Sequence, residues 1–238
     1  MEHIVDAGQL SAVYTRLLVP SFSPDELISL ATLQQETADG DMIVTGLRTG
    51  DRLGAVAIGS WYPSISAMLL AYLTVDSGSR GQGLGSRLLR ETLDFWHDLH
   101  APRLVVAEVE HPDYYPVDPD RGDPAARLRF YGQLGARVLD LPYFQEQLSP
   151  ETERVYRMLL LALRVDPDLL NADGTRLVDV TSLRGMLQLD DSDLAGSAPD
   201  AESEAVRALR EAVDIEGGVR LYDTSAYRGV ATSRPPGS

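Results

Sequence analysis

The chain has 238 residues, of which 44% are hydrophobic and 24% are charged, and its formal net charge is −15. These proportions are typical of soluble globular chains and exclude a mostly disordered chain, collagen or a coiled-coil rod. The acidic balance argues against a generic duplex nucleic acid partner, because such binding rests on a basic surface. An acidic surface favours cationic partners in encounter, and simple solubility explains the same charge.

Two residue types are missing. The chain contains no cysteine, and all 21 of its basic residues are arginine. It can therefore form no disulfide, thiolate metal site or cysteinyl intermediate. No apolar run approaches the ~20 residues of a membrane span, and the first ten residues lack the basic and apolar segments of a signal peptide. We therefore expect a cytoplasmic protein with no membrane partner.

Hydrophobic spacing predicts alternating elements along the chain. In order, we expect helices at 6–18 and 24–37, strands at 42–48, 52–61 and 65–75, a helix from about 84 to 97, a strand at 103–110, a helix at 125–134, and strands at 136–144 and 154–164. The run at 65–75 is almost wholly apolar and should lie centrally in the sheet with both faces covered. This order predicts a mixed α/β sheet.

The character of the chain changes after Asp166, where Asp, Pro, Asn and Gly interrupt the pattern. We expect a domain over 1–164 and a small helical C-terminal extension over 165–223, with helices near 181–189 and at 200–213. Residues 224–238 are polar and end in RPPGS, which predicts a flexible tail.

A glycine-rich segment at 80–86, RGQGLGS, follows the apolar strand and opens a helix. Glycine allows positive φ and a close approach to a bulky anion, while a helix N-terminus presents unpaired N–H groups. With the charge of Arg80, the segment predicts a pyrophosphate cradle. A Rossmann site would need its first glycine directly after the strand, and a Walker loop needs GxxxxGK[ST], which is absent. A glycine-rich turn before an ordinary helix stays open.

At these residues the chain resembles the GNAT superfamily of acyl-CoA N-acyltransferases. RGQGLG matches the family signature R/Q-x-x-G-x-G/A, and 127–135 (RLRFYGQLG) resembles its second motif. The resemblance covers roughly 1–164. It implies an α/β fold with a GNAT-like mixed central sheet of about seven strands flanked by helices.

The resemblance also implies acetyl-CoA as the acyl donor, in a cleft where two neighbouring strands splay apart. Its pantetheine arm would pair with the strand, and its pyrophosphate would lie on the glycine-rich turn. The implied cofactor-binding residues are Leu73, Thr74, Val75, Arg80, Gly81, Gln82, Gly83, Leu84, Gly85 and Ser86.

The implied reaction is acetyl transfer to a primary amine by direct attack in a ternary complex. An alkylammonium has a pKa near ~10.4, so a base must take its proton. The family often uses a glutamate on the strand before the loop, but this chain has Ala71 there. We therefore expect the base at Glu108 or Glu110, which share a face of the next strand and whose like charges would raise one pKa. Glu108 is preferred because it lies deeper, and an exposed acidic strand end is the alternative.

Tyr131 aligns with the family's tyrosine general acid, which protonates the departing thiolate. A phenol with a pKa near ~10 holds its proton at neutral pH. A core aromatic beside Phe130 is the alternative. The motif normally ends Leu-Gly-Phe, whereas Ala136 follows Gly135 here.

The loop at 111–124 is the expected acceptor wall, because aromatic and acidic side chains suit a small-molecule or peptide amine. Its candidates are Tyr114, Tyr115, Asp118 and Asp120, and a plain proline-rich connection fits equally well. His97, His100 and His111 lack partners at ligand spacing, so we expect no metal.

Two other classes stay open. A coenzyme-binding regulatory module that does not transfer would explain Ala71, and an interaction scaffold would use the C-terminal helices. The oligomeric state, including a homodimer, also stays open.

Overall fold

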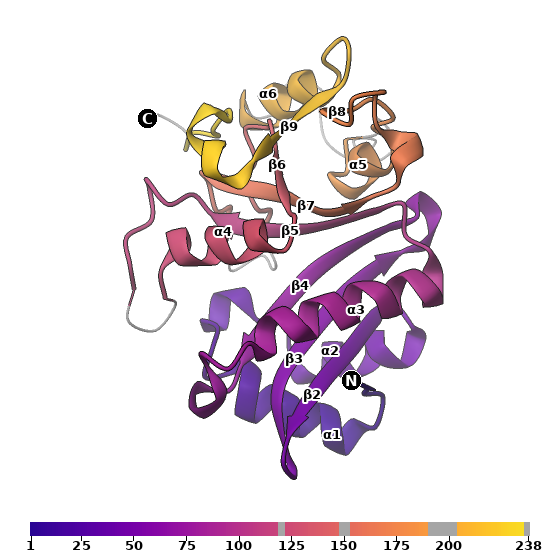
Figure 1. Ribbon diagram of the computed structural model, residues 1–238, viewed down its shortest axis with the longest axis vertical. Helices are drawn as coiled ribbons and strands as arrows, with labels where there is room; N and C mark the ends of the chain where they lie inside the picture. Colours follow the sequence, from indigo (N-terminus) through magenta and orange to yellow (C-terminus); the bar gives the residue numbers. More distant parts are fainter. Residues whose placement is uncertain (119–121, 148–152, 190–203, 236–238) are drawn as a thin grey trace.

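The computed structural model describes residues 1–118, 122–147, 153–189 and 204–235. Over these ranges, nine strands form one sheet in the order β1-β2-β3-β4-β5-β7-β6-β9-β8 (Figure 1). The strands are β1 (Glu2–His3), β2 (Met42–Thr49), β3 (Arg52–Tyr62), β4 (Ala67–Val75), β5 (Leu104–Glu110), β6 (Arg137–Leu139), β7 (Met158–Val165), β8 (Arg176–Leu177) and β9 (Val219–Asp223). The mixed α/β sheet predicted from the sequence is confirmed, with two strands more than the seven expected.

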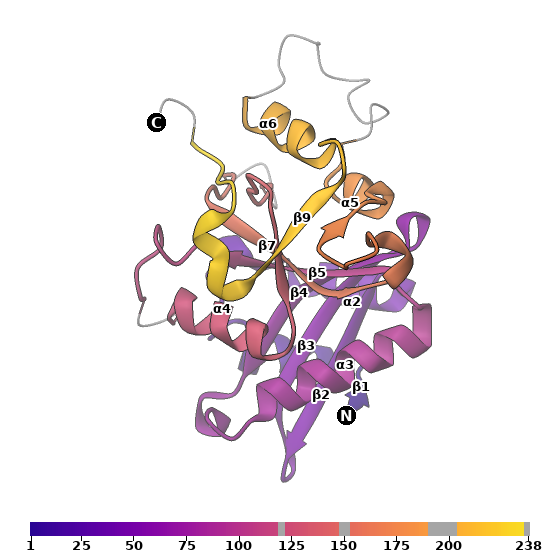
Figure 2. The same cartoon turned by 45° about the horizontal axis from the view of Figure 1, so that its top comes forward.

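Helices cover both faces of this sheet. They are α1 (Ala7–Val13), α2 (Leu30–Asp39), α3 (Leu84–His100), α4 (Pro124–Gln133), α5 (Thr181–Met186) and α6 (Glu204–Val213). Buried residues of α3 and α4 form one core with β2 to β5 and β7. On the opposite face, α1 and α2 cover the N-terminal strands, while α5 and α6 cover the C-terminal ones (Figures 1 and 2).

The β4–β5 pair positions the site. It is parallel, whereas the other pairs between described strands are antiparallel. Pairing runs from Ala67 opposite Leu104 to Leu70 opposite Ala107 and then stops. Beyond that point the two strands separate, so the second half of β4 has no strand neighbour on β5.

A β-bulge lies where the strands separate. On the other side of β4, Leu70 is opposite Gly59 and Tyr72 is opposite Ile58, which leaves Ala71 as the extra residue. A bulge bends its strand and increases its twist. The bend at Ala71 therefore turns β4 away from β5 and opens a cleft within the sheet.

Local signals explain several boundaries. Leu88, Leu89, Thr92 and Trp96 are buried on one side of α3, as their helical spacing predicts. The helix expected over 24–37 is split instead: Pro24–Glu26 is a separate 3-10 turn, and α2 begins only at Leu30. Ser29 is the N-cap of α2, and its side chain accepts a hydrogen bond from the Thr32 N–H. The extended backbone at Ser29 separates α2 from the preceding 3-10 turn.

The C-terminal segment differs from its prediction. Strand β9 pairs with β6, so the extension expected over 165–223 shares the main sheet and covers what would otherwise be an exposed edge. Residues 224–235, which were expected to form a flexible tail, pack against the rest of the protein instead. The 3-10 helix η7 (Thr224–Gly229) of this segment contacts α4, and the Ser233 hydroxyl donates to the Tyr143 carbonyl at 2.6 Å. Residues 200–203 and 236–238 of these predictions lie outside the described ranges.

Candidate active site

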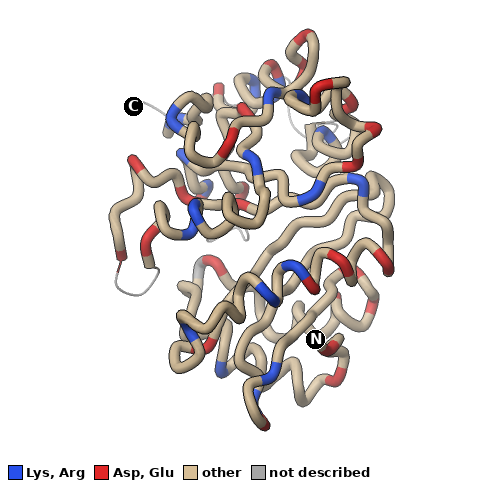
Figure 3. Tube along the Cα trace, in the orientation of Figure 1, with Lys and Arg blue, Asp and Glu red and all other residues tan. Residues whose placement is uncertain are grey.

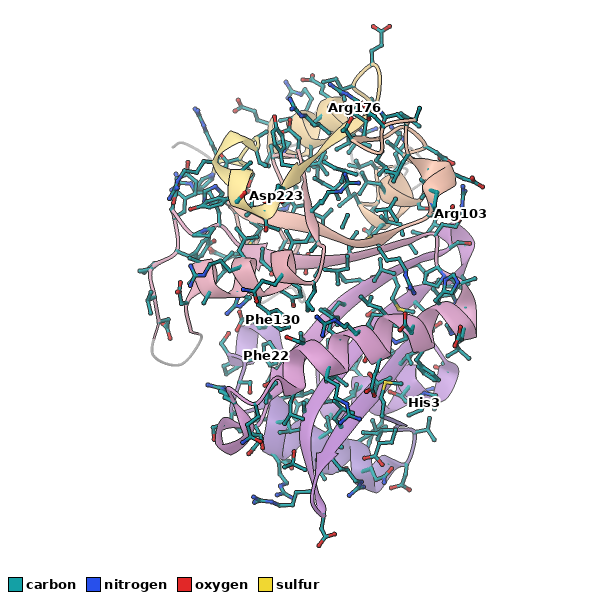
Figure 4. The ribbon with its side chains drawn as sticks, in the orientation of Figure 1. His3, Phe22, Arg103, Phe130, Arg176 and Asp223 are labelled. Carbon is teal, nitrogen blue, oxygen red and sulfur yellow. The ribbon has the colours of Figure 1, made fainter. Side chains whose placement is uncertain are left out.

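A cavity of about 480 Å³ occupies the cleft where β4 leaves β5. Residues of β4 beyond the bulge form one wall, and Arg127, Phe130 and Tyr131 of α4 form the facing wall. Phe22, from the segment before α2, closes the cleft near Phe130 (Figure 4). Backbone groups of β4 on this side find no strand partner on β5, so a ligand can satisfy them.

The predicted glycine turn lies at the end of this cavity. Gly81 and Gly83 have φ of +76° and +75°, a conformation that favours glycine. Gly83 is the N-cap of α3, so the N–H groups of the first helical turn lack intrahelical acceptors. An added Cβ at Gly85 would lie 3.4 Å from the Val75 side chain and 3.5 Å from Phe130, both of which line the cavity. The helix N-terminus is therefore adjacent to the cleft.

Arg80 adds a full positive charge at the same place. It lines the cavity, and its Nε donates to the Val75 carbonyl at 3.3 Å. Acidic and basic residues are interspersed along the chain, with the acidic ones more numerous (Figure 3). Because the Debye length is ~8 Å at physiological salt, distant carboxylates are screened while Arg80 and the helix terminus act at contact range. These residues fit a diphosphate.

Glu108 and Glu110 have different surroundings, although both lie on the same face of β5. Glu108 is partly buried, and the Tyr143 hydroxyl donates a hydrogen bond to its Oε1. Burial raises the pKa of Glu108 above its usual value, and the hydrogen bond from Tyr143 acts in the opposite direction. Glu110 instead forms an ion pair with Arg127 of α4, with 3.4 Å between Oε2 and Nη1. The cause of the raised pKa is thus burial rather than the predicted repulsion between the two carboxylates.

A second cavity, of about 690 Å³, lies on the other side of the cleft. Glu108 is the residue that lines both cavities among the residues described. The remaining walls come from Glu36 and Tyr62, from the segment 143–147, and from the C-terminal part of the chain. Local sequence patterns do not predict this cavity, since nothing in them connects α2, Tyr143 and α6.

Tyr131 lies in the wall of the first cavity with 6% of its surface exposed. Burial raises its pKa to about 12, so the phenol remains protonated at neutral pH. Its ring also meets that of Phe130 edge-on, with centroids 5.1 Å apart. The residue is therefore a packed aromatic whose phenol also lines the cleft, and its role as general acid stays a prediction.

Among the described residues, those predicted to form the acceptor wall do not line the two cavities above. Tyr114, Tyr115 and Asp118 are absent from the described linings of both cavities. Tyr115 donates to the Tyr156 carbonyl at 2.6 Å, and the Tyr114 ring lies 4.5 Å from the Arg157 guanidinium carbon. Only the end of the loop, at Gly122 and Asp123, borders the first cavity. Asp120 lies outside the described residues.

No group of three or more histidine and acidic residues that could hold a metal occurs in the described parts of the chain. His100 stacks on Trp61 with ring centroids 4.7 Å apart, and His111 is buried between Tyr114 and Tyr227. Within the same ranges, no helix has the length and apolar character needed to cross a membrane.

Comparison with known proteins shows what the segment around this site is similar to. A family model described as acetyltransferase (GNAT) family matches residues 12–115, which include β4, the glycine turn and Glu108. A putative GNAT-family acetyltransferase from Bacteroides thetaiotaomicron has a similar structure, with a TM-score of 0.56 and 20% identity over 79% of this chain and 96% of that one. A search of curated proteins gives no match.

Two further similar structures have TM-scores below 0.5. One is the ribosomal-protein-S18-alanine N-acetyltransferase from Escherichia coli, with a TM-score of 0.47 and 18% identity over 69% of this chain and 95% of that one. The other is a putative acetyltransferase from Salmonella typhimurium, solved with its cofactor acetyl-CoA, with a TM-score of 0.48 and 15% identity over 70% and 94%.

The order of the strands and the separation of β4 from β5 give this chain a GNAT-like fold. Within that fold, residues 12–115 match the model described as acetyltransferase (GNAT) family. The resemblance drawn from RGQGLGS is thereby confirmed.

Proposed function

We propose that this chain transfers the acetyl group of acetyl-CoA to a primary amine, by direct attack within a ternary complex. The observation that carries the proposal is the position of Glu108 between two cavities. One cavity lies beside the glycine turn and includes a strand edge, unpaired with β5, that suits the donor. The other gives an amine a separate route to the same carboxylate.

The first cavity binds the donor. In this proposal the N–H groups from Gln82 to Ser86 and the charge of Arg80 hold the diphosphate, as a helix N-terminus holds anions generally. The backbone of Leu73, Thr74 and Val75 pairs with the amide-bearing arm, because β5 leaves this edge of β4 unpaired. A β4 N–H also polarises the thioester carbonyl.

Glu108 is the base. It takes a proton from the incoming ammonium, directly or through one water, and so frees the nitrogen lone pair for attack. Burial raises its pKa toward the range in which a carboxylate accepts a proton at neutral pH. Glu110 is bound to Arg127, so we assign it the positioning of α4 against β5.

Tyr131 is the general acid. When bound, acetyl-CoA supplies an acyl carbon whose bond to sulfur breaks as its bond to nitrogen forms. Tyr131 gives its hydroxyl proton to the departing sulfur and regains one from solvent. Glu108 releases the proton that it took, and the nitrogen, once bonded to the acyl carbon, loses a second proton to solvent. Because Tyr131 takes one of these two protons back, the overall reaction liberates one proton. With no cysteine in the chain, transfer through a cysteinyl intermediate is excluded.

A second candidate function is a CoA-binding regulatory module without transfer. Ala71 favours it, because no carboxylate stands at the strand position that the family often uses. In that case the first cavity binds acetyl-CoA and Glu108 has only the structural contact with Tyr143.

Two measurements on the full chain separate these functions. Calorimetry measures binding of acetyl-CoA, and a thiol-reactive dye measures CoA release with a panel of amines, without background because the protein has no thiol. We expect binding and turnover with at least one amine. Tight binding without turnover would establish the regulatory module, and no binding by folded protein would overturn both.

A further inference from the structure

We propose that the second cavity selects a primary amine carried on an uncharged, apolar body, and rejects amines that bear a carboxylate beside the amino group. This inference rests on the proposed function, since it names the acceptor class for that reaction. The size, the aliphatic residues and the charges of the cavity support it.

The size of the second cavity suits a small molecule. Ligand cavities usually measure about 300–1,000 Å³, and this one measures about 690 Å³. Glu108 lies at the junction with the donor cleft, so the reacting nitrogen belongs at that end. The rest of the volume extends away from the donor and is available to the body of the acceptor.

Aliphatic side chains from the C-terminal part of the chain form part of the wall around that volume, and three glutamines, Gln145, Gln147 and Gln188, are also in the lining. The aliphatic side chains come from the end of α5, from the residues that follow it and from α6: Met186, Leu187, Leu189, Val206 and Leu209. These elements follow the matched domain of residues 12–115, so this wall is a feature that the chain adds beyond that segment. An apolar wall is stabilised when an apolar ligand displaces water from it.

The charges of the lining favour a cation. Arg154 lines the cavity, but its Nε lies 2.8 Å from the Glu146 carboxylate, so its charge is compensated. Glu36 and Glu108 have no cationic side chain within ion-pair distance among the described residues. An ammonium is attracted to these two carboxyl groups.

A carboxylate on the acceptor has the opposite effect. Attached next to the amino group, it must enter the same end of the cavity as Glu108. Like charges at short range in a partly buried site repel each other strongly. The cavity therefore discriminates between two molecules of equal apolar size by repulsion as well as by attraction.

Steady-state kinetics with three matched amines tests this selectivity. The probes are 2-phenylethylamine, phenylalanine, which adds only a carboxylate, and putrescine, which replaces the apolar body with a second ammonium. We expect kcat/KM for 2-phenylethylamine to exceed that for phenylalanine by at least about tenfold, and also to exceed that for putrescine. A preference for phenylalanine or for putrescine would overturn the inference while leaving the transfer reaction intact.

Two variants assign the selectivity to this cavity. Glu36→Gln should raise KM for 2-phenylethylamine several-fold with little change in kcat, because Glu36 attracts the cation but does not meet the reacting carbon. Val206→Ser should raise KM for 2-phenylethylamine and leave KM for methylamine, which has no apolar body, unchanged. The exposed Glu211→Gln and Arg207→Ser on α6 are matched controls and should behave as the parent protein. Unchanged KM in both cavity variants would contradict the assignment.

Binding gives a readout independent of turnover. Calorimetric titration of the CoA-bound protein with the same three amines should show the same order of affinity. If no amine releases CoA but this order holds, the proposed transfer fails and the selectivity stands. If amines react without this order, the selectivity fails and the transfer stands.

Discussion

The Tyr143 hydroxyl donates a hydrogen bond to Oε1 of Glu108 and thereby holds the carboxylate at the junction of the two cavities. Tyr143 is 7% exposed, and burial raises its pKa well above the usual value, so it remains a donor. Its own backbone is fixed by Ser233, whose hydroxyl donates to the Tyr143 carbonyl. The C-terminal segment thus positions the proposed base through one intervening residue.

Replacing Tyr143 with phenylalanine should shift the pH dependence of catalysis. Burial raises the pKa of Glu108 and the hydrogen bond from Tyr143 lowers it, so removing the hydroxyl leaves the raising effect unopposed. Glu108 then becomes protonated at higher pH, and the acidic limb of the kcat/KM profile moves upward in pH. Tyr222→Phe, on β9, is the control. An acidic limb that stays in place in Tyr143→Phe would show that Glu108 does not set it.

The two carboxylates of β5 can be separated by isosteric substitution. Glu108→Gln should lower kcat by about 10²–10⁴-fold, the usual contribution of a general base, while the Kd of acetyl-CoA stays unchanged. Glu110→Gln should mainly lower stability, because it breaks the ion pair with Arg127. Single-turnover kinetics and calorimetry measure both. A larger loss of kcat in Glu110→Gln would transfer the role of base to that residue.

The glycine turn can be tested by adding a carboxylate. Gly83→Glu should abolish detectable acetyl-CoA binding, because it places a negative charge and a side chain at the N-cap of α3. Gly40→Glu is a matched control, because Gly40 also has a positive φ, of +84°, and an added Cβ there meets nothing within 4 Å. Gly40 is the C-cap of α2 and is distant in sequence from the glycine turn. Both variants carry similar backbone strain, so only a charge effect at the site separates them. Equal binding in the two would refute the diphosphate site.

Tyr131→Phe should slow the chemical step without weakening donor binding. The hydroxyl is removed while the buried ring and its packing against Phe130 remain. We expect a decrease in kcat of about 10²-fold or more, as for loss of a general acid, and an unchanged Kd for acetyl-CoA. Rapid-quench measurement of acetyl transfer at pH 7–9 distinguishes the chemical step from product release. Full activity throughout that range would refute the assignment.

Gly132→Ala should destabilise the protein by about 1–3 kcal/mol, the range of overpacked substitutions. An added Cβ at Gly132 would lie 2.0 Å from the Thr224 hydroxyl oxygen, so η7 must move away from α4. Urea unfolding measures the change. Gly229→Ala is the control, because its nearest contact would be an ordinary 3.6 Å. Adding Thr224→Ala to Gly132→Ala should restore part of the loss, and no loss in the single variant would show that η7 does not pack against α4 in solution.

Much of the donor side was predictable from short stretches of sequence. The strand before the turn, the glycines of the turn and the buried stripe of α3 are local patterns, and the structure has them at the expected residues. The departure at Ala71 was also visible, but its structural meaning was not. Only pairing with β3 shows Ala71 to be a bulge at the point where β4 turns away from β5.

The acceptor wall predicted at the loop of residues 111–124 stays a prediction. Its two tyrosines contact a backbone carbonyl and an arginine of the protein itself. The residues around the second cavity come from α2, the segment after β6, and α6, which are distant in the chain. Local residue spacing does not predict contacts between residues that are so distant in the chain.

The amino-acid sequence alone indicated the resemblance to GNAT acetyltransferases, the alternation of helices and strands, and the turn beside α3, because these depend on periodicity, glycine conformation and neighbouring residues. Tertiary structure alone decided which glutamate is buried, what raises its pKa, and that the C-terminal segment joins the sheet to wall the second cavity. Burial and proximity arise only when distant segments pack together, and they control both the protonation of Glu108 and the room left for an acceptor.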